Sequence, residues 1–410
     1  MRPALCVLFV STTLFLTRPT FAGEQQMSYA EVLLRAERLS PDLRVARLKE
    51  NVARAEIGIA GVLPNPSLTA GTSTQAARIS AGVSVPLLIF GQRGAAIEAS
   101  RADLTTTETD TRVASIDVRA AAAHAYVALW RAQSMAVENQ HGAALARHLE
   151  EAVAGRVELG AAPSVDGLRA HAERLRADAQ AQQTEQLVAA AGSDLGRWLG
   201  MDDGADLRAK DAPPVPAPPP PIAELRARID RSPVVGRERA DAAAAEARAR
   251  RERALVRPLV TLDLGLDAFD QTLCPNGPCS NPPLNYRGAL TLEVPLLSMR
   301  GPYVERELAN ADQARARESA GRLRLAAALT SAYRTFEAWS ANARALAEGV
   351  VPAATAAASA AEESYALGRA PLVAVLDAEK ARIDASLALL DARSQEADAW
   401  IEVEHSVAAP

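Results

Sequence analysis

The residues best suited to chemistry are a pair of cysteines and a pair of histidines. Cys274 and Cys279 flank a Pro-Asn-Gly-Pro turn, which in an exported protein predicts a local disulfide. A metal site is the alternative, but two thiolates without a nearby histidine make a poor ligand set. His141 and His148 lie seven residues apart on a predicted helix, which is typical of solvated histidines on a helix face. We therefore expect no bound metal.

The chain also lacks the motifs of common catalytic sites. It contains no phosphate-binding loop, no zinc-type His-Glu helix and no nucleophile elbow. Its Asp and Glu residues follow helix surfaces, and none is set apart in a segment that suggests a pocket. The formal net charge is -5 and the arginines form no basic stripe, which argues against a nucleic-acid partner. The sequence predicts no enzyme, no cofactor and no nucleic acid.

Residues 1–22 have the pattern of a secretory signal peptide. Arg2 precedes an apolar run from Leu5 to Leu16, and Thr20-Phe21-Ala22 offers small residues for cleavage after Ala22. The run is too short for a convincing transmembrane helix, and no later stretch approaches the ~18 to 20 continuous apolar residues that such a helix needs. The sequence predicts export, with any membrane contact made by β-strands.

The mature chain contains an internal duplication. Short motifs recur in the same order in both halves: Ser40-Pro41 as Ser232-Pro233, Val85-Pro86-Leu87-Leu88 as Val294-Pro295-Leu296-Leu297, and Leu159-Gly160 with Pro163 as Leu367-Gly368 with Pro371. An ordered series of this kind predicts two repeats, over residues 23–212 and 222–410. Residues 213–221 between them read as a proline-rich linker.

Each repeat is predicted to contain a helix, a strand pair, a long helix, a sharp turn and a returning helix. In the first repeat, helices cover residues 29–59 and 94 to about 159. In the second, a helix over 304–367 is followed by one over 372–403, and Pro352 should kink the first of these or mark a boundary. Long helices of ~65 residues would measure about 100 Å. A pair of them cannot bury its apolar stripe within one chain, which favours a tube shared between subunits.

Four short segments alternate apolar and polar residues with period two, as transmembrane barrel strands do. They fall within about residues 67–86 and 259–295, and their polar positions include Asp263, Asp267, Arg287 and Glu293, which we expect to face a wet lumen. A pair of hairpins half buried on a soluble domain is the alternative. Four strands cannot close a barrel, and unpaired edges cannot stand in lipid. If the strands span a membrane, several copies of the chain must therefore combine them.

The chain resembles the TolC family of outer membrane efflux proteins over nearly the whole mature sequence. The residues that carry the resemblance are Ser40-Pro41-Asp42-Leu43, Gly61-Val62-Leu63-Pro64-Asn65-Pro66, Val85-Pro86-Leu87 before Phe90-Gly91, and the turns at Leu159-Gly160 and Leu367-Gly368. The resemblance implies a mostly α-helical homo-trimer with a twelve-stranded β-barrel in the outer membrane and a helical tunnel through the periplasm. It also implies a passive efflux channel that works with a periplasmic adaptor protein and an inner-membrane transporter of the RND type in a Gram-negative bacterium.

The resemblance assigns roles to the two turns. Leu159, Gly160, Pro163, Leu367, Gly368 and Pro371 resemble the periplasmic tips at which adaptor hairpins dock. Asp166 and Tyr365 resemble members of a polar network that holds the tip closed, and Asp377 matches a constriction carboxylate. Ala374 stands where some members have a second Asp, which weakens a cation-binding ring. The alternative for Asp377 is an ion pair with Lys380 or Arg382 on the same helix.

A periplasmic adaptor or other coiled-coil scaffold without a barrel is the rival interpretation. Such proteins also have export signals and long helical hairpins, but adaptors as a class have one hairpin flanked by compact β-rich modules. Here each repeat combines a hairpin with two membrane-type strands. The stretch Leu63-Pro64-Asn65-Pro66 resembles the branch of the family that serves metal-cation pumps, so metal export is one hypothesis for the cargo and drug export another.

Overall fold

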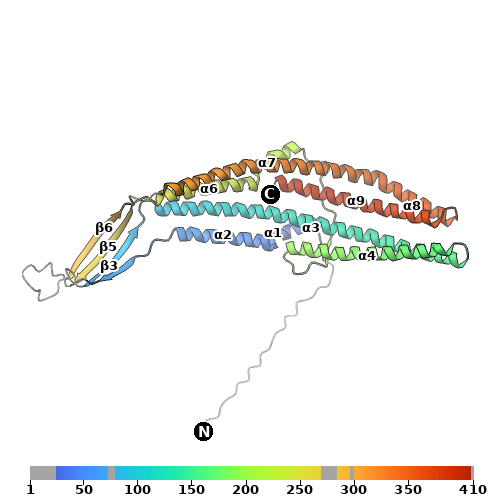
Figure 1. Cartoon of the computed structure of the whole chain (residues 1–410), viewed down its shortest axis with the longest axis horizontal. Helices are drawn as coiled ribbons and strands as arrows, with labels where there is room; N and C mark the ends of the chain where they lie inside the picture. Colours follow the sequence, from blue (N-terminus) through green and yellow to red (C-terminus); the bar gives the residue numbers. More distant parts are fainter. Residues whose placement is uncertain (1–24, 73–78, 269–283, 296–299, 408–410) are drawn as a thin grey trace, which may run out of the picture.

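The structure is a computed structural model that describes residues 25–72, 79–268, 284–295 and 300–407. The chain is elongated, with a small sheet at one end and helical hairpins that extend to the other (Figure 1). The predicted signal peptide and the cysteines Cys274 and Cys279 lie outside the described residues. Within the described part of the chain, none of the helices has the length and apolar character to cross a membrane.

The two halves of the chain share a series of two helices, two strands, a long helix and a returning helix. The first consists of β1 (Gln25–Met27), α1 (Tyr29–Leu39), α2 (Pro41–Ala60), β2 (Ser67–Gly71), β3 (Ile79–Leu87), α3 (Gln92–Glu158), α4 (Ser164–Trp198) and β4 (Leu207–Ala209). The second consists of α5 (Ile222–Arg228), the short 3-10 helix η1 (Ile229–Arg231), α6 (Pro233–Ala254), β5 (Leu259–Ala268), β6 (Leu284–Glu293), α7 (Gly301–Ala345), the π-helical turn η3 (Leu346–Val350), α8 (Val351–Ala366) and α9 (Leu372–Val407). The mostly helical fold that the sequence predicts is confirmed. Residues 210–221, which include the proline-rich stretch, form neither helix nor strand.

The single helix predicted over residues 29–59 is two helices, so that prediction was wrong. Ser40 separates α1 from α2 with φ -53° and ψ 128°. Proline has no backbone N–H, and its ring keeps the preceding residue out of the helical region, so Pro41 begins a new helix at its first position. Ser232, with φ -58° and ψ 133°, and Pro233 repeat this arrangement before α6. The duplicated Ser-Pro pair is thus a helix boundary in both repeats.

The long helix of the second repeat widens directly before Pro352. Leu346–Val350 form a π-helical turn, in which the backbone N–H of Val351 donates to the carbonyl of Leu346. A proline ring inside an α-helix clashes with the carbonyl four residues earlier, and a π-helical turn relieves such a clash by changing the hydrogen-bond spacing. Pro352 therefore marks a boundary, as predicted, whereas α3 continues for 67 residues without a break.

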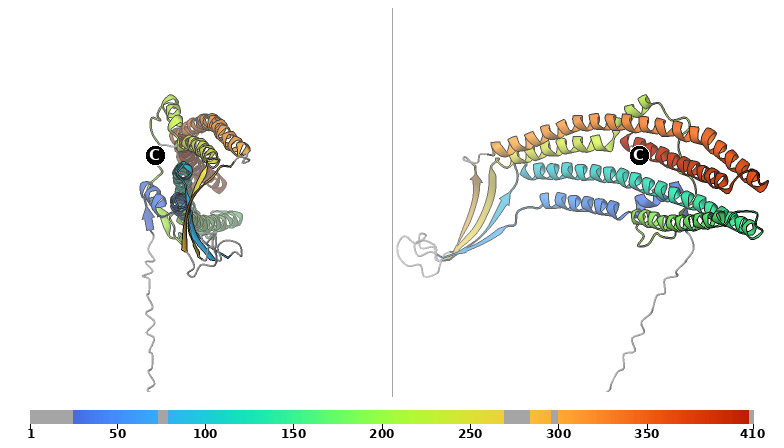
Figure 2. Two further views of the ribbon diagram at one scale, coloured as in Figure 1. Left: turned by 90° about the vertical axis from the view of Figure 1, so that its left-hand side faces the viewer. Right: turned by 45° about the vertical axis from the view of Figure 1, so that its right-hand side comes forward.

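The main apolar core lies midway along the helices, at the ends of α4 and α9. Tyr126, Leu129 and Leu195 are fully buried there, and Ile401 of α9 belongs to the same cluster. Trp400, the neighbouring residue on α9, packs in a second cluster with Phe336 of α7. Helix α9 therefore joins the two repeats, and Figures 1 and 2 show it between α7 and α3.

Candidate functional site: the sheet and the helical tips

The four long strands form one antiparallel sheet in the order β2-β3-β5-β6. The central pair, β3 and β5, joins the two repeats, in register from Ile79 opposite Ala268 to Leu87 opposite Val260. Residues that face each other across antiparallel strands point to the same side of the sheet. The register therefore sorts every strand residue onto one of two faces.

One face of the sheet is polar, and hydrogen bonds between strands hold its charged groups. The carboxylate of Asp263 accepts from the hydroxyls of Ser84 on β3 and of Thr291 on β6, the latter at 2.9 Å. Arg287 forms an ion pair with Asp267, with 3.6 Å between Nη1 and Oδ2. Glu293, opposite Leu259, ends β6 on the same face. The structure thus brings Asp263, Asp267, Arg287 and Glu293 together on one face; that this face lines a lumen stays a prediction.

A glycine makes room for the charged pair on this face. Gly265 lies opposite Arg287, and a Cβ atom at Gly265 would stand 3.2 Å from Nη2 of that arginine. The guanidinium therefore lies across the bare backbone of β5. This explains the one small residue in an otherwise regular alternation of Asp and Leu.

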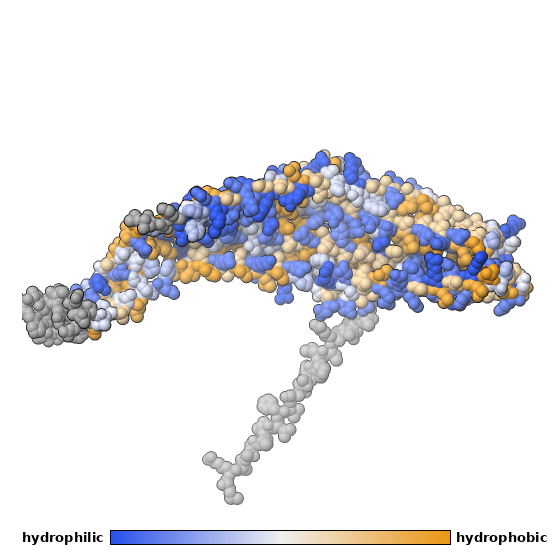
Figure 3. Space-filling view, in the orientation of Figure 1, coloured by the Kyte–Doolittle hydropathy of each residue, from blue (hydrophilic) through white to orange (hydrophobic). Residues whose placement is uncertain are grey.

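The opposite face of the sheet is apolar and exposed in the single chain. Leu68 is 80% exposed, Tyr286 76% and Leu290 69%, and Ile79 and Leu264 are also exposed. Apolar side chains are visible over the sheet in the space-filling view (Figure 3). Monomeric soluble proteins rarely expose a contiguous apolar patch of this kind without a partner or a membrane against it.

The sheet also has two open edges. Among the described residues, β2 pairs only with β3 and β6 pairs only with β5. The outer edge of each therefore presents a row of unpaired backbone N–H and C=O groups, which are ready to pair with another strand. A membrane would demand that they do so, because it offers no water to satisfy them.

Hydrogen bonds to backbone carbonyls fix the sheet to the helices. Arg93 donates to the carbonyl of Gly61 at 2.7 Å, and Arg257 donates to that of Phe90 at 2.6 Å. Gln92 donates to the carbonyl of Pro258 at 2.9 Å. Gly91, with φ 84°, makes the turn from β3 into α3, and a Cβ atom there would collide with the Arg257 guanidinium. The Phe-Gly motif is therefore a junction between β3 and the long helix α3.

The other end of the molecule consists of two turns with the same hydrogen-bond pattern. Leu159 ends α3, and Gly160 follows with φ 67°; the N–H of Gly160 donates to Val157, and that of Ala161 donates to Arg156. Leu367 and Gly368, with φ 69°, repeat both bonds at the end of α8. This is the Schellman motif, which satisfies the last carbonyls of a helix and needs a left-handed residue. Pro163 and Pro371 then lead into α4 and α9.

Both turns present a leucine to the surroundings. Leu159 is 85% exposed and Leu367 is 59% exposed. The turns nevertheless pack against each other through a small apolar cluster of Val153, Ala170 and Leu372, with Tyr365 half-buried beside it. The two hairpins therefore end together at one tip region.

Tyr365 and Asp166 lie in this region but contact different groups. The Tyr365 ring lies under the guanidinium of Arg156, at 4.5 Å, and Arg156 also donates to the Tyr365 carbonyl at 3.2 Å. Asp166 is half-buried in the first turn of α4, and no hydrogen bond joins it to Tyr365 in the described chain. Sequence reasoning missed Arg156. Its position in the last turn of α3 was visible, but its partner depends on how the hairpins pack.

Asp377 is exposed on α9, near the tip. Arg382 forms ion pairs with Glu379 of its own helix at 2.9 Å and with Glu138 of α3 at 3.0 Å. No ion pair of Asp377 occurs in the part of the chain that the structure describes, so the alternative pairing with Lys380 or Arg382 is wrong. The carboxylate is free to face whatever lies beside α9.

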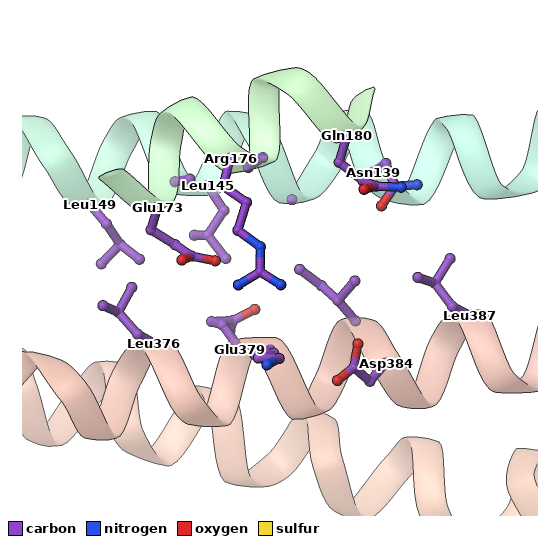
Figure 4. A pocket seen from close by; sticks show the side chains of 15 residues that line it. Asn139, Leu145, Leu149, Glu173, Arg176, Gln180, Leu376, Glu379, Asp384 and Leu387 are labelled. Atoms are coloured by element: carbon purple, nitrogen blue, oxygen red, sulfur yellow. The ribbon is translucent and has the colours of Figure 1, made fainter. Parts of the chain in front are cut away.

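A cavity of about 210 Å³ separates the first hairpin from α9 above the tip (Figure 4). Leucines of α3 and α9 line it, among them Leu149 and Leu376, and Arg176 of α4 reaches toward Glu379. At the wall of this cavity Ile383 of α9 comes close to Gly142 of α3, where an added Cβ atom would lie 3.0 Å from Cδ1 of the isoleucine. His141 and His148 are exposed, as predicted, and no cluster of three metal-ligating side chains occurs within residues 25–72, 79–268, 284–295 and 300–407.

Comparisons with known proteins agree with this architecture. The chain is similar to CusC, whose crystal structures concern folding and transmembrane channel formation. The identity is 17% and the TM-score 0.73, with 92% of this chain and 91% of that chain covered. It is similar to the outer membrane protein VceC of Vibrio cholerae (16% identity, TM-score 0.71, 93% and 96% covered) and to the outer membrane channel CmeC of Campylobacter jejuni (15% identity, TM-score 0.71, 99% and 94% covered). No curated protein sequence matches significantly.

At such low identities these similarities establish a shared fold. The sequence model of the outer membrane efflux proteins is more specific, because it matches residues 32–201 and 226–409. These two segments correspond to the two repeats and together cover most of the chain. The chain therefore belongs to the outer membrane efflux protein family.

Proposed function

We propose that three copies of this chain form a passive channel through the outer membrane, which releases solutes from a pump and catalyses no reaction. The observation that carries the proposal is the sheet: it is apolar on one face, charged on the other, and open at both edges. Four strands from each of three copies would make twelve, an even number within the range of outer membrane barrels.

The strand lengths suit this arrangement. β5 and β6 contain 10 residues each, and a tilted strand of about 9 to 11 residues crosses the hydrocarbon core. In the proposed barrel, β6 of one copy pairs with β2 of the next, the apolar face meets lipid, and Asp263, Asp267, Arg287 and Glu293 face the lumen. Each open edge then finds a partner, which meets the demand of the membrane for paired backbone groups.

The helical tips supply the proposed contact with the rest of the pump. The hairpins of a periplasmic adaptor would dock at the two turns. These turns contain Leu159, Gly160 and Pro163 in the first repeat and Leu367, Gly368 and Pro371 in the second. An inner-membrane transporter of the RND type would complete the assembly. Exposed leucines on rigid turns support this role, because they offer apolar anchors on a pre-formed backbone. Metal cations or drugs are the proposed cargo, with the selection made by the transporter.

The proposed constriction lies beside these tips. Three copies of Asp377 around a threefold axis would form a ring of carboxylates, with Asp166 and Tyr365 in the surrounding network. Charge rings select ions of the opposite sign. Asp377→Asn is therefore expected to shift the permeability ratio of K⁺ to Cl⁻ toward one in planar bilayers, as measured by the reversal potential in a salt gradient. Asp194→Asn also removes one charge per chain, but at the opposite end of α4, and should leave the ratio unchanged. Equal shifts in both variants would remove the constriction assignment.

Carbonate extraction separates the channel from the rival adaptor or scaffold. A barrel protein is expected to remain in the membrane pellet at alkaline pH, and a scaffold without a barrel to wash off. The detergent-solubilised protein should then elute as a trimer, with its mass determined by light scattering. A chain that is released by carbonate and runs as a monomer without detergent would contradict the proposal. Recovery of a trimer in the washed membrane supports it.

A further inference from the structure

Four ion pairs, which we call the rungs of a ladder, join α3 of the first repeat to α9 of the second. From the middle of the molecule toward the tips, the rungs are Asp117–His405 at 3.0 Å, His124–Asp398 at 2.7 Å, Arg131–Asp391 at 2.7 Å and Glu138–Arg382 at 3.0 Å. On α3 these residues recur every seven positions, which places them on one face of the helix. The two rungs nearest the middle depend on histidine, and the two nearer the tips depend on arginine.

The geometry at His124 favours a protonated ring. Its Nδ1 lies 2.7 Å from Asp398, and its Nε2 lies 3.0 Å from Glu402. A neutral imidazole has only one N–H, so one ring nitrogen would then turn its lone pair toward a carboxylate. The imidazolium ion has two N–H donors and satisfies both contacts. His405 lies nearby, with Nε2 3.0 Å from Asp117 and Nδ1 3.9 Å from Glu402.

The surroundings of the two histidines are mainly acidic. Around His124, α9 contributes Asp398 and Glu402. Tyr29 of α1 lines the same small cavity as His405, and burial raises the pKa of this tyrosine to about 12, so that it stays neutral. Around His405 lie Asp117 and Glu402, while Glu404 and Arg228 line the same small cavity as this histidine. Arg119 is engaged with Glu37 of α1 at 3.3 Å. The groups in direct contact with the two histidine rings are all carboxylates.

The hydrogen bond to Asp398 and the charges of both carboxylates raise the pKa of His124 above its usual value of 6.5, although burial opposes them. The sign of the effect follows from this direction. A histidine whose pKa is higher in the contact than out of it contributes its full stabilisation below pH 6.5. This contribution disappears as the pH rises through the raised pKa. The arginine rungs keep their charge over the same range.

We propose that His124, with Asp398 and Glu402, forms a pH-sensitive latch beside the Asp117–His405 pair, which strengthens the contact of the C-terminal end of α9 with α3 in mildly acidic surroundings and weakens it in alkaline ones. The apolar packing of Ile401 keeps this end of α9 against α3 at either pH, and Arg131–Asp391 and Glu138–Arg382 are unaffected. Because the latch lies within one chain, it does not depend on the channel proposal. The helical part of the molecule would become looser along one seam only.

Hydrogen–deuterium exchange of the full, detergent-solubilised chain tests the latch. The exchange is compared at pH 6 and pH 8.5 after correction for the intrinsic pH dependence of amide exchange. Peptides within residues 396–407 are expected to lose protection at the higher pH, by about tenfold for each unit by which the latch raises the pKa of His124. Peptides within residues 380–392, beside the arginine rungs, serve as the internal control and should change little. Parallel changes in both segments, or none in either, would overturn the latch.

Paired substitutions identify the groups responsible. In the double variant His124→Gln, His405→Gln, protection of 396–407 should be low at both pH values, and in His124→Arg, His405→Arg it should be high at both. Arg131→Gln should lower the protection of 396–407 by the same factor at pH 6 and at pH 8.5. The difference between the two pH values should therefore remain. Circular dichroism and gel filtration establish that each variant is folded. If the double Arg variant does not fold, the Gln variant decides, because a pH difference of wild-type size in that variant also refutes the proposal.

Discussion

Leu290→Arg should leave little assembled protein in the outer membrane, whereas Thr291→Arg should assemble nearly as well as the wild type. The two positions are neighbours on β6 and receive the same new side chain, but they lie on opposite faces of the sheet. Leu290 is 69% exposed on the apolar face. An arginine facing lipid near the bilayer midplane costs roughly 2 to 4 kcal/mol, and the proposed trimer would bear three of them.

Thr291 instead faces the polar side, where its hydroxyl donates to Asp263. An arginine there points away from lipid and finds a carboxylate to pair with. The measurement is the amount of trimer in carbonate-washed outer membranes, detected on a gel before and after heating. Asp263→Asn keeps a hydrogen-bonding side chain on the polar face and provides a second control that should assemble normally. Equal losses at positions 290 and 291 would show that the faces are wrongly assigned.

The second large effect is expected at the tips. Gly160→Val and Gly368→Val should abolish efflux while a trimer still forms, and the corresponding Asn variants should keep most of the activity. Both glycines have φ near +70°, at 67° and 69°, a region that costs a β-branched residue roughly 1 to 2 kcal/mol and that Asn tolerates. No described heavy atom lies within 4 Å of an added Cβ atom at either position, so the backbone angle rather than a clash decides the outcome.

The valine would therefore distort the Schellman turn and displace the exposed leucine before it. The measurements are export of a pump substrate and site-specific cross-linking to the adaptor, with trimer yield as the control for folding. Six such turns occur in the proposed trimer, so small distortions add up around the ring. Normal cross-linking in both Val variants would contradict the role of the tips, even if export were reduced.

Much of this arrangement could be predicted from local pattern. The alternation of Asp263 and Leu264 along β5 sorts them onto opposite faces whatever the rest of the chain does, because side chains alternate along every strand. The ends of the long helices were predictable for a similar reason, since Gly160 and Gly368 supply the left-handed residue that a helix end needs. The break at Ser40 was missed, although the Ser-Pro pair was noticed, because helical spacing on both sides outweighed a single proline.

Pairing between distant segments could not be predicted in this way. The alignment of β3 with β5 joins two repeats, and either strand could slide by two residues without changing its own pattern. The contact of Arg156 with Tyr365 depends on the relative height of two hairpins. The same holds for the ladder: the seven-residue spacing of Asp117, His124 and Arg131 was visible, but nothing in it names a partner.

The amino-acid sequence alone determined the duplicated plan, the two faces of the sheet and the sharp turns at the tips, since each follows from the conformational preference of a few neighbouring residues. Only the tertiary structure decided which charges meet across α3 and α9 and which hydroxyls hold Asp263. Those contacts depend on how helices and strands from different repeats are shifted against each other. Packing over the whole length of the molecule sets that shift, so it cannot be predicted from a local sequence pattern.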